Sequence, residues 1–213
     1  MMHIVFALYP GITQLDFTGP YEVFSRIPGA RVSVASLEGG ELRTEHGLTF
    51  SGTGRLADVQ DCTLLCVPGG PDQSAAMTEA FFAELRRLAA QATYITSVCN
   101  GSLLLGAAGL LRGKRGACHW AVRPLLEKYG ALPDPARVVR DGNIITGGGV
   151  TAGIDFALTV AAEIASPTVA QTIQLLLEYA PAPPFNSGRP ETAPPEVLGA
   201  FRKWLAAAEG AQA

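Results

Sequence analysis

The chain has 213 residues, of which 48% are hydrophobic and 16% are charged, so we expect one globular domain and exclude disorder on that scale. The net charge of −3, with no Lys/Arg run longer than two residues, argues against a nucleic-acid partner. No stretch approaches the roughly 20 apolar residues that a membrane helix needs, and the apolar start is broken at Pro10 and Gly11. We therefore expect a cytoplasmic protein without membrane contact.

Five apolar, β-rich runs are predicted to be strands. They cover residues 3–9, 31–37, 62–67, 93–98 and 143–146. Each run is almost continuously hydrophobic rather than alternating, which is typical of strands buried on both faces of a parallel sheet. Helix-like segments separate several of the runs. The pattern predicts the α/β class, with a doubly wound, mostly parallel sheet flanked by helices.

Helical spacing predicts the remaining elements. A crossover helix should occupy residues 78–92, and two further helices should run over residues 151–164 and 168–179. A Pro-rich arm, residues 181–195, should precede a last amphipathic helix over residues 196–208. We interpret residues 1–213 as a single domain that carries this arm and helix. The apolar side chains of the last helix suit either a homodimer or packing within one subunit.

The four cysteines are too sparse for a disulfide framework and point to a reducing compartment. They are Cys62, Cys66, Cys99 and Cys118. Cys62 and Cys66 share one face of a predicted strand without a second ligand pair at zinc spacing, so we predict that both pack in the core. The sequence predicts no metal site.

The segment around Cys99 carries the strongest chemical signal. A predicted strand ends at Val98, and a helix begins at Gly101 and Ser102, just after Cys99 and Asn100. This spacing predicts a nucleophile elbow, a sharp turn that presents one side chain above the edge of the sheet. The start of a helix can lower the pKa of a cysteine from about 8.5 to roughly 4 to 7.5. We therefore expect Cys99 to be largely thiolate at neutral pH.

A thiolate needs a partner that gives or takes a proton, and Asp16 is the better candidate. It follows the first predicted strand and should lie at the carboxyl edge of the sheet, where doubly wound folds place their sites. Leu15, Phe17 and Pro20 should shield it, and desolvation would raise its pKa toward a useful acid/base range. The alternative is a capping role in a helix that opens near Thr13.

His119 is the second candidate partner. It follows the elbow by some twenty residues and could approach Cys99 in space, although a histidine beside a tryptophan is more often a packed core group. The chain has no His and Glu two residues apart late in the sequence. This excludes the class I glutamine amidotransferases, which use a Cys-His-Glu set.

A first glycine cluster, the PGGP motif at residues 68–71, follows the strand that contains Cys66. The backbone N–H of Gly70, together with that of Asn100, would stabilise negative charge that develops in a substrate. The alternative is a simple turn.

A second glycine cluster, GGGVTA at residues 147–152, formally matches the dinucleotide fingerprint G-x-G-x-x-G/A. We reject a nucleotide site, because the fingerprint needs an acidic residue about twenty residues later at the end of a strand, and a helix is predicted there instead. We predict that Gly149, Val150 and Thr151 line the pocket of the thiolate. No cofactor is expected.

Taken together, VPGGP, SVCNGSLLLGAAGLLRGKRGACHW and TGGGVTAGIDFAL resemble the DJ-1/PfpI superfamily over residues 3–180. Within it, LDFTGPYEVF, the non-histidine after the cysteine and the TAGIDFAL loop are most similar to isonitrile (isocyanide) hydratases. The resemblance implies a metal-free homodimer that adds water to an isonitrile and gives an N-substituted formamide. It also implies Cys99 as nucleophile, Asp16 as acid/base, and the Gly70 and Asn100 amides in an anion-stabilising pocket. Those hydratases usually carry threonine where this chain has Asn100.

Two alternative functions stay open. A glyoxal- or methylglyoxal-consuming enzyme, or an oxidative-stress protein, would use the same thiol, although such members generally pair it with glutamate rather than with an aspartate like Asp16. The ligand-sensing half of an AraC-like regulator would be joined to a helix-turn-helix pair of roughly 100 residues. The sequence contains no such basic helical pair, which makes the regulator the weaker alternative.

Overall fold

The computed structural model describes residues 2–210 of the chain. These residues belong to two compact units, Met1–Glu178 and Tyr179–Ala213. The first unit contains the sheet and the helices that flank it. In the second, residues 180–194 form no helix or strand, and α6 (Pro195–Gly210) follows. The Pro-rich segment and the last helix therefore lie where the sequence predicts them.

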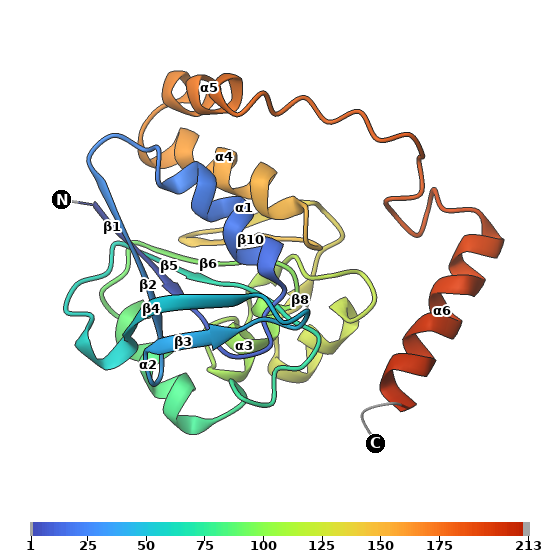
Figure 1. Cartoon of the computed structure of the whole chain (residues 1–213), viewed down its shortest axis with the longest axis horizontal. Helices are drawn as coiled ribbons and strands as arrows, with labels where there is room; N and C mark the ends of the chain where they lie inside the picture. The colour runs from blue at the N-terminus through green and yellow to red at the C-terminus, as the bar shows by residue number, and fades with distance from the viewer. Residues whose placement is uncertain (1, 211–213) are drawn as a thin grey trace. The chain divides into compact units, whose positions relative to one another are not determined.

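A mixed, mostly parallel sheet forms the centre of the first unit, and its strand order is β3-β4-β2-β1-β5-β6-β10-β9 (Figure 1). Only the two outer pairs, β3 with β4 and β9 with β10, are antiparallel. The strands are β1 (Met2–Ala7), β2 (Ala30–Ser36), β3 (Gly40–Arg43), β4 (Thr49–Arg55), β5 (Leu64–Val67), β6 (Tyr94–Ser97), β9 (Val138–Asp141) and β10 (Ile144–Gly147). The predicted fold class is confirmed.

The five predicted strands correspond to β1, β2, β5, β6 and β10. All four residues of β5 and of β10 are buried, as expected for strands covered on both faces. The strands that sequence analysis missed lie at the edges, where β3, β4 and β9 have mixed polar sequences and exposed residues. A further small pair, β7 (Arg115–Gly116) and β8 (Leu132–Pro133), was also missed.

Helices cover both faces of the sheet: α1 and α4 lie on one side and α2 and α3 on the other (Figure 1). Close packing joins α1 to α4, α4 to α5, and α2 to α3. The α-helices of this unit are α1 (Gln14–Phe24), α2 (Glu79–Ala89), α3 (Gly101–Ala107), α4 (Ala152–Ile164) and α5 (Pro167–Leu176). Two 3-10 helices accompany them, η1 (Leu56–Asp58) and η2 (Arg123–Tyr129).

Local signals explain where two of the helices begin and end. Thr78 caps α2 by accepting a hydrogen bond from the Phe81 N–H at 3.3 Å. Ser166 caps α5 in the same way, and Pro167 occupies the first helical position. The last helical residue of α5 is Leu176, three residues before the predicted end, and Glu178 follows in the left-handed region with φ 48°.

The strand order gathers four loops at one edge of the sheet. After β1 the chain moves to β2 on one side, and it later returns to β5 on the other, so a topological switch point lies between β1 and β5. The parallel strands β1, β5, β6 and β10 all end at the same edge. The segments that follow these strands contain most of the residues singled out from the sequence, with Asp16 in α1 after β1, whereas His119 follows β7.

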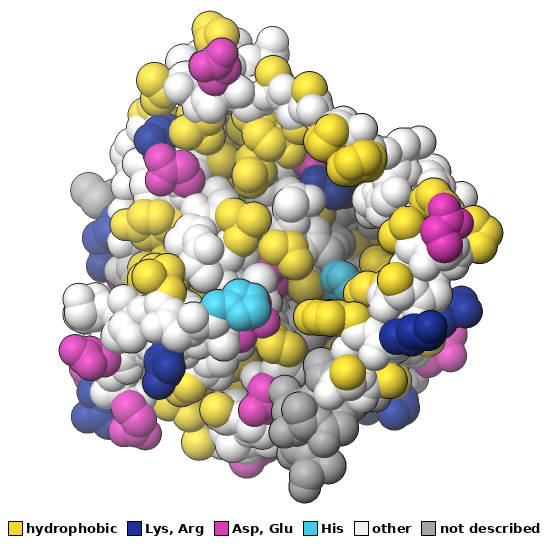
Figure 2. All heavy atoms as spheres, turned by 45° about the vertical axis from the view of Figure 1, so that its right-hand side comes forward, with side chains coloured by type: hydrophobic (Ala, Val, Ile, Leu, Met, Phe, Trp, Pro, Cys, Tyr) yellow, Lys and Arg dark blue, Asp and Glu magenta, His cyan; other side chains and the backbone are white. Residues whose placement is uncertain are grey.

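Charged side chains of both signs are interspersed on the face drawn in Figure 2, and the described residues there form no broad basic area. Such a surface has no electrostatic footprint for a phosphate backbone. Within residues 2–210, no helix is long and apolar enough to cross a bilayer.

The contact between α1 and α4 gives a test of the core. The Phe156 side chain of α4 is fully buried, and its ring lies 6.0 Å from that of Phe24 in α1. We expect Phe156→Ala to lower the free energy of unfolding by about 3 to 5 kcal/mol in urea denaturation, because it leaves a cavity. The control Phe185→Ala removes an exposed ring and should change stability by less than about 0.5 kcal/mol. Equal effects of the two substitutions would contradict this packing.

Candidate active site

Cys99 occupies a sharp turn between β6 and α3. Its φ of 57° lies in the left-handed region, which a residue with a side chain adopts only when its surroundings hold it there. The Cys99 N–H donates hydrogen bonds to the carbonyls of Gly147 at 3.1 Å and Gly148 at 2.8 Å. A Cβ at Gly101 would overlap the carbonyl oxygen of Val67, so glycine is required where the elbow crosses β5. The loops of β5 and β10 therefore fix the elbow.

The sulfur of Cys99 is almost completely buried. The backbone N–H groups of Val150 and Asn100 donate to it and lower its pKa, but burial and the charge of Asp16 raise the pKa well above its ordinary value. The expected thiolate is therefore a thiol in the resting site. The pKa expectation was wrong because α3 is only seven residues long and its dipole does not offset the loss of solvation.

Asp16 lies in the first turn of α1 and is fully buried. Burial raises the pKa of Asp16 to about 7, and the nearby charge of Glu45 adds to the shift, whereas interactions with the Cys99 side chain and the Gly69 N–H lower it. The Gly69 N–H donates to Asp16 Oδ2 at 3.0 Å. The predicted desolvation of Asp16 is present, and it brings the carboxyl to a pKa that suits proton transfer near neutral pH.

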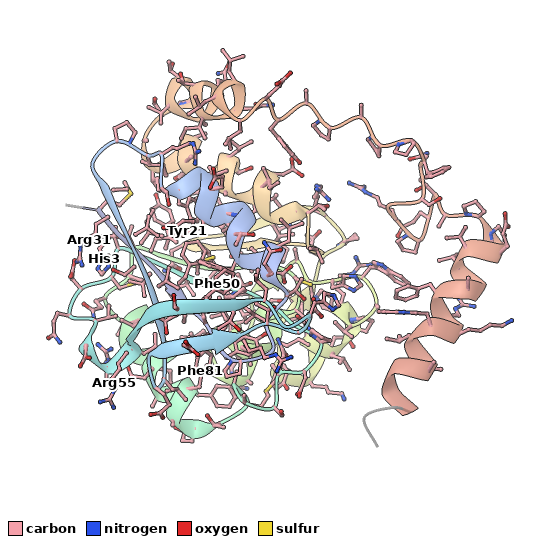
Figure 3. All side chains as sticks on the ribbon, viewed as in Figure 1. His3, Tyr21, Arg31, Phe50, Arg55 and Phe81 are labelled. Atoms are coloured by element: carbon pink, nitrogen blue, oxygen red, sulfur yellow. The ribbon has the colours of Figure 1, made fainter. Side chains whose placement is uncertain are left out.

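The residue that follows Asp16 belongs to an aromatic cluster. Phe17, the next residue after Asp16, packs between Tyr21 and Phe50, with ring centroids 5.2 Å apart in both pairs. Figure 3 labels Tyr21 on α1 and Phe50 on β4, the two elements that enclose this ring. Phe17 is thus buried in an aromatic cluster at the start of α1.

The titrations of Asp16 and Cys99 are coupled. Asp16 Oδ1 is buried and has no hydrogen-bond partner among the described residues. Because each group shifts the pKa of the other, their protons leave in steps that belong to the pair. Above a pH of about 7 the pair holds one proton, and the raised pKa of Cys99 keeps that proton on the sulfur.

The PGGP loop is hydrogen-bonded to the Asn100 side chain. The Gly70 N–H donates to Asn100 Oδ1 at 2.9 Å, and Asn100 Nδ2 donates to the Gly70 carbonyl at 2.8 Å. The Gly70 amide therefore already has an acceptor in this state, and its role in stabilising substrate charge stays a prediction. The carboxamide of Asn100 is likewise bonded to the loop and not to the sulfur.

The loop after β10 supplies one wall of the site. Val150 contributes its N–H to the Cys99 sulfur, as described above. A Cβ at Gly149 would lie 2.8 Å from Cδ2 of His119, so the imidazole packs directly on this loop. Thr151 is exposed, and its hydroxyl accepts a hydrogen bond from Arg137 Nη2 at 3.2 Å, so this hydroxyl is not directed to the sulfur.

His119 is placed as a packed group. Its Nδ1 accepts a hydrogen bond from the Ala121 N–H at 3.3 Å, and burial lowers the pKa of the ring. A neutral imidazole with its proton on Nε2 satisfies this arrangement. Among the described residues, no cluster of three or more His, Cys, Asp or Glu side chains forms a possible metal site.

Three polar neighbours of the elbow were not predicted from the sequence. Gln73 is buried and its Nε2 donates to the Asn100 carbonyl at 2.9 Å and to the Tyr9 hydroxyl at 3.3 Å. Cys118 is buried beside Ser102, and burial raises the pKa of its thiol to about 11. No motif distinguishes Gln73 or Cys118, although a tyrosine at the end of an apolar strand, just before Pro-Gly, was a usable signal for Tyr9.

Comparison with known proteins places this arrangement in a family. A model of the DJ-1/PfpI family matches residues 2–163. The chain belongs to the DJ-1/PfpI family. It is 49% identical over 203 residues to the isonitrile hydratase of Pseudomonas putida, with 95% of this chain and 89% of that protein covered. The family resemblance inferred from the sequence is confirmed.

Solved structures and a second curated relative extend the comparison. The crystal structure of a ThiJ/PfpI family protein from Pseudomonas syringae superposes with a TM-score of 0.93 at 42% identity and covers 96% of this chain and 86% of its own. The structure of DJ-1beta from Drosophila melanogaster gives 0.76 at 26% identity, covering 84% and 99%. The transcriptional regulator CdhR of Pseudomonas aeruginosa is 31% identical over 172 residues, 78% of this chain and 51% of the regulator.

The raised pKa of Asp16 predicts how stability depends on pH. Between 3.8, its ordinary pKa, and about 7, the folded protein holds a proton that the unfolded chain releases. The stabilising contribution is therefore complete below a pH of about 4 and decreases as the pH rises to 7, by about 2 to 4 kcal/mol. Asp16→Asn abolishes this dependence, so the variant should gain stability relative to the wild type over the same interval.

Urea denaturation at several pH values measures this difference. The exposed Asp58 of η1 offers the control Asp58→Asn, for which the difference from the wild type should change far less with pH. If the free energy of unfolding of the wild type, taken relative to that of Asp16→Asn, rises between pH 4 and 7, the result would contradict a raised pKa of Asp16.

Proposed function

We propose that this protein is an isonitrile hydratase, which adds water to an isonitrile and releases an N-substituted formamide. One observation carries the proposal: a buried cysteine thiol lies next to a buried carboxyl group whose pKa is about 7. The 49% identity to the isonitrile hydratase of Pseudomonas putida supports it. An isonitrile needs such a pair, because its terminal carbon accepts both a nucleophile and a proton.

In the first step, Cys99 is the nucleophile and Asp16 moves its proton. The singly protonated pair begins as thiol and carboxylate, and Asp16 takes the thiol proton as the sulfur attacks the terminal carbon. Asp16 then delivers that proton to the same carbon. One S–C bond and one C–H bond form, the S–H bond breaks, and the product is a thioimidate on Cys99.

In the second step, Asp16 is again a carboxylate and can activate water. It takes one proton from the water as the water oxygen attacks the thioimidate carbon, and it passes that proton to the nitrogen, which gives a neutral tetrahedral adduct. The adduct then expels sulfur as its C–S bond breaks. Its hydroxyl proton passes through Asp16 to the sulfur, the C=O bond forms, and the formamide leaves. The N–H groups of Val150 and Asn100 stabilise charge on the departing sulfur. The free atom Oδ1 of Asp16 suits both proton transfers.

We also propose that the protein is a cytoplasmic homodimer that needs no metal, cofactor or nucleic acid. Some exposed apolar side chains are available to be buried at a subunit interface: Leu175 and Leu176 on α5, and Val197 and Trp204 on α6. Sedimentation of the full chain at micromolar concentration tests this part, and a monomer would contradict it.

Parallel incubation with an alkyl isonitrile and with methylglyoxal tests the reaction itself. We expect formamide from the isonitrile and no comparable hydroxy acid from methylglyoxal. Cys99→Ala should abolish turnover, and Asp16→Asn should lower kcat by about 10² to 10⁴-fold, the usual range for loss of a general acid/base. Chromatography of both products measures these rates.

The matched control is Cys62→Ala, a buried cysteine whose pKa is raised to about 12 and which we assign to the core. It should retain turnover. Full activity in Cys99→Ala or Asp16→Asn would remove the mechanism. Faster consumption of methylglyoxal than of the isonitrile would favour the aldehyde-directed alternative.

A further inference from the structure

The PGGP loop joins the nucleophile to the acid. On one side, the peptide group of Gly70 exchanges two hydrogen bonds with the Asn100 carboxamide, next to Cys99. On the other side, the Gly69 N–H donates to Asp16 Oδ2, and the Gly69 carbonyl accepts from the Thr13 N–H at 2.9 Å. Gly69 thus bonds both to the start of α1 and to the side chain that α1 presents.

The loop has little room to move between these two side chains. A Cβ at Gly69 would overlap Asn100 Oδ1 and would lie 2.8 Å from Asp16 Oδ2. A Cβ at Gly70 would come within 2.6 Å of the carbonyl oxygen of Gly11. Such contacts mean that a displacement of the Asn100 side chain is transmitted to the Gly69 N–H and from there to the carboxyl.

Gln73 holds the main chain of Asn100 from the other side. Its Nε2 donates to the Asn100 carbonyl and also to the Tyr9 hydroxyl, and Gln73 and Tyr9 are both buried. The Tyr9 ring packs edge-on against Phe81 of α2, which Figure 3 labels beneath the sheet. Asn100 is therefore fixed at its backbone and at its side chain.

We propose that Asn100 is a positioning residue that acts on Asp16 through the Gly70 and Gly69 peptides. Its role is to keep the Gly69 N–H on Oδ2, so that Oδ1 stays free to exchange protons with Cys99 and a substrate. The consequence for turnover rests on the proposed function. The consequence for the reactivity of Cys99 rests only on the site geometry.

Loss of the Asn100 carboxamide should change the pH at which the pair of Asp16 and Cys99 loses its first proton. The Gly69 N–H favours the carboxylate of Asp16, so a weakened bond raises the pKa of that group. The other titratable groups that interact with Asp16 are not altered by a substitution at Asn100: they are Tyr9 on the loop after β1, Glu45 on the loop after β3, Cys66 on β5, Cys99 on the elbow and Cys118 after β7.

The rate of Cys99 alkylation by iodoacetamide between pH 5 and 9 measures this step on the full-length protein. In the wild type the rate should rise with a midpoint near 7, where the pair becomes singly protonated. In Asn100→Ala the midpoint should move up by about one pH unit, the size expected for one hydrogen bond to a charged group. Asn143→Ala, the same substitution on the exposed loop before β10, should leave the midpoint in place.

A double variant distinguishes positioning from general loosening. In Asp16→Asn the step near 7 should disappear, and adding Asn100→Ala should then produce no shift. Asn100→Ser removes the carboxamide but keeps a polar side chain at the start of α3, so it should show the same upward shift. It replaces Asn100→Ala in the test if the alanine variant folds poorly. An unchanged midpoint in both Asn100→Ala and Asn100→Ser would overturn the proposal. So would a change of the profile in the Asp16→Asn background as large as the change that Asn100→Ala causes in the wild type.

Isonitrile turnover measured on the same samples separates the two proposals. A shifted alkylation midpoint without any formamide from the wild type would contradict the proposed function and support the role of Asn100. Formamide formation with an alkylation midpoint that Asn100→Ala does not move would support the proposed function and contradict the role of Asn100.

Discussion

The site depends on the burial of one carboxyl group and one thiol, those of Asp16 and Cys99. The two groups lie close enough for each to shift the pKa of the other. Burial raises the pKa of Asp16 to about 7 and keeps Cys99 protonated at rest. Burial thereby brings the carboxyl to a proton affinity at which it can both take and release a proton near neutral pH. The chemistry proposed here needs both steps, so the desolvation is its physical basis.

The fold supplies this desolvation at the switch point between β1 and β5. Cys99, Asp16 and the glycine loops come from segments that are distant in sequence, and the parallel strands bring their ends to one edge. Glycines at positions 69 and 101 allow backbone to pass where a side chain would overlap. The strain of Cys99 at φ 57° is held by the carbonyls after β10 and by the helix that follows.

The sequence was sufficient for the central strands, the elbow and the choice of Asp16, because apolar runs and tight turns are local patterns. It was not sufficient for the edge strands β3, β4 and β9, whose polar residues face solvent and leave no apolar run. It also misjudged the pKa of Cys99, since burial depends on segments that the local sequence does not specify. The pairing of Asn100 with Gly70, and the contacts of Gln73, join residues about thirty positions apart and have no local signature.

Titration of the Asp16 carboxyl carbon by ¹³C NMR, with assignment by its loss in Asp16→Asn, tests the central claim most directly. The account predicts a midpoint near 7 in the free protein, with the Cys99 thiol still protonated as the carboxyl ionises. A midpoint near 4, the ordinary value of an aspartate, would show that the carboxyl is solvated and would contradict the account.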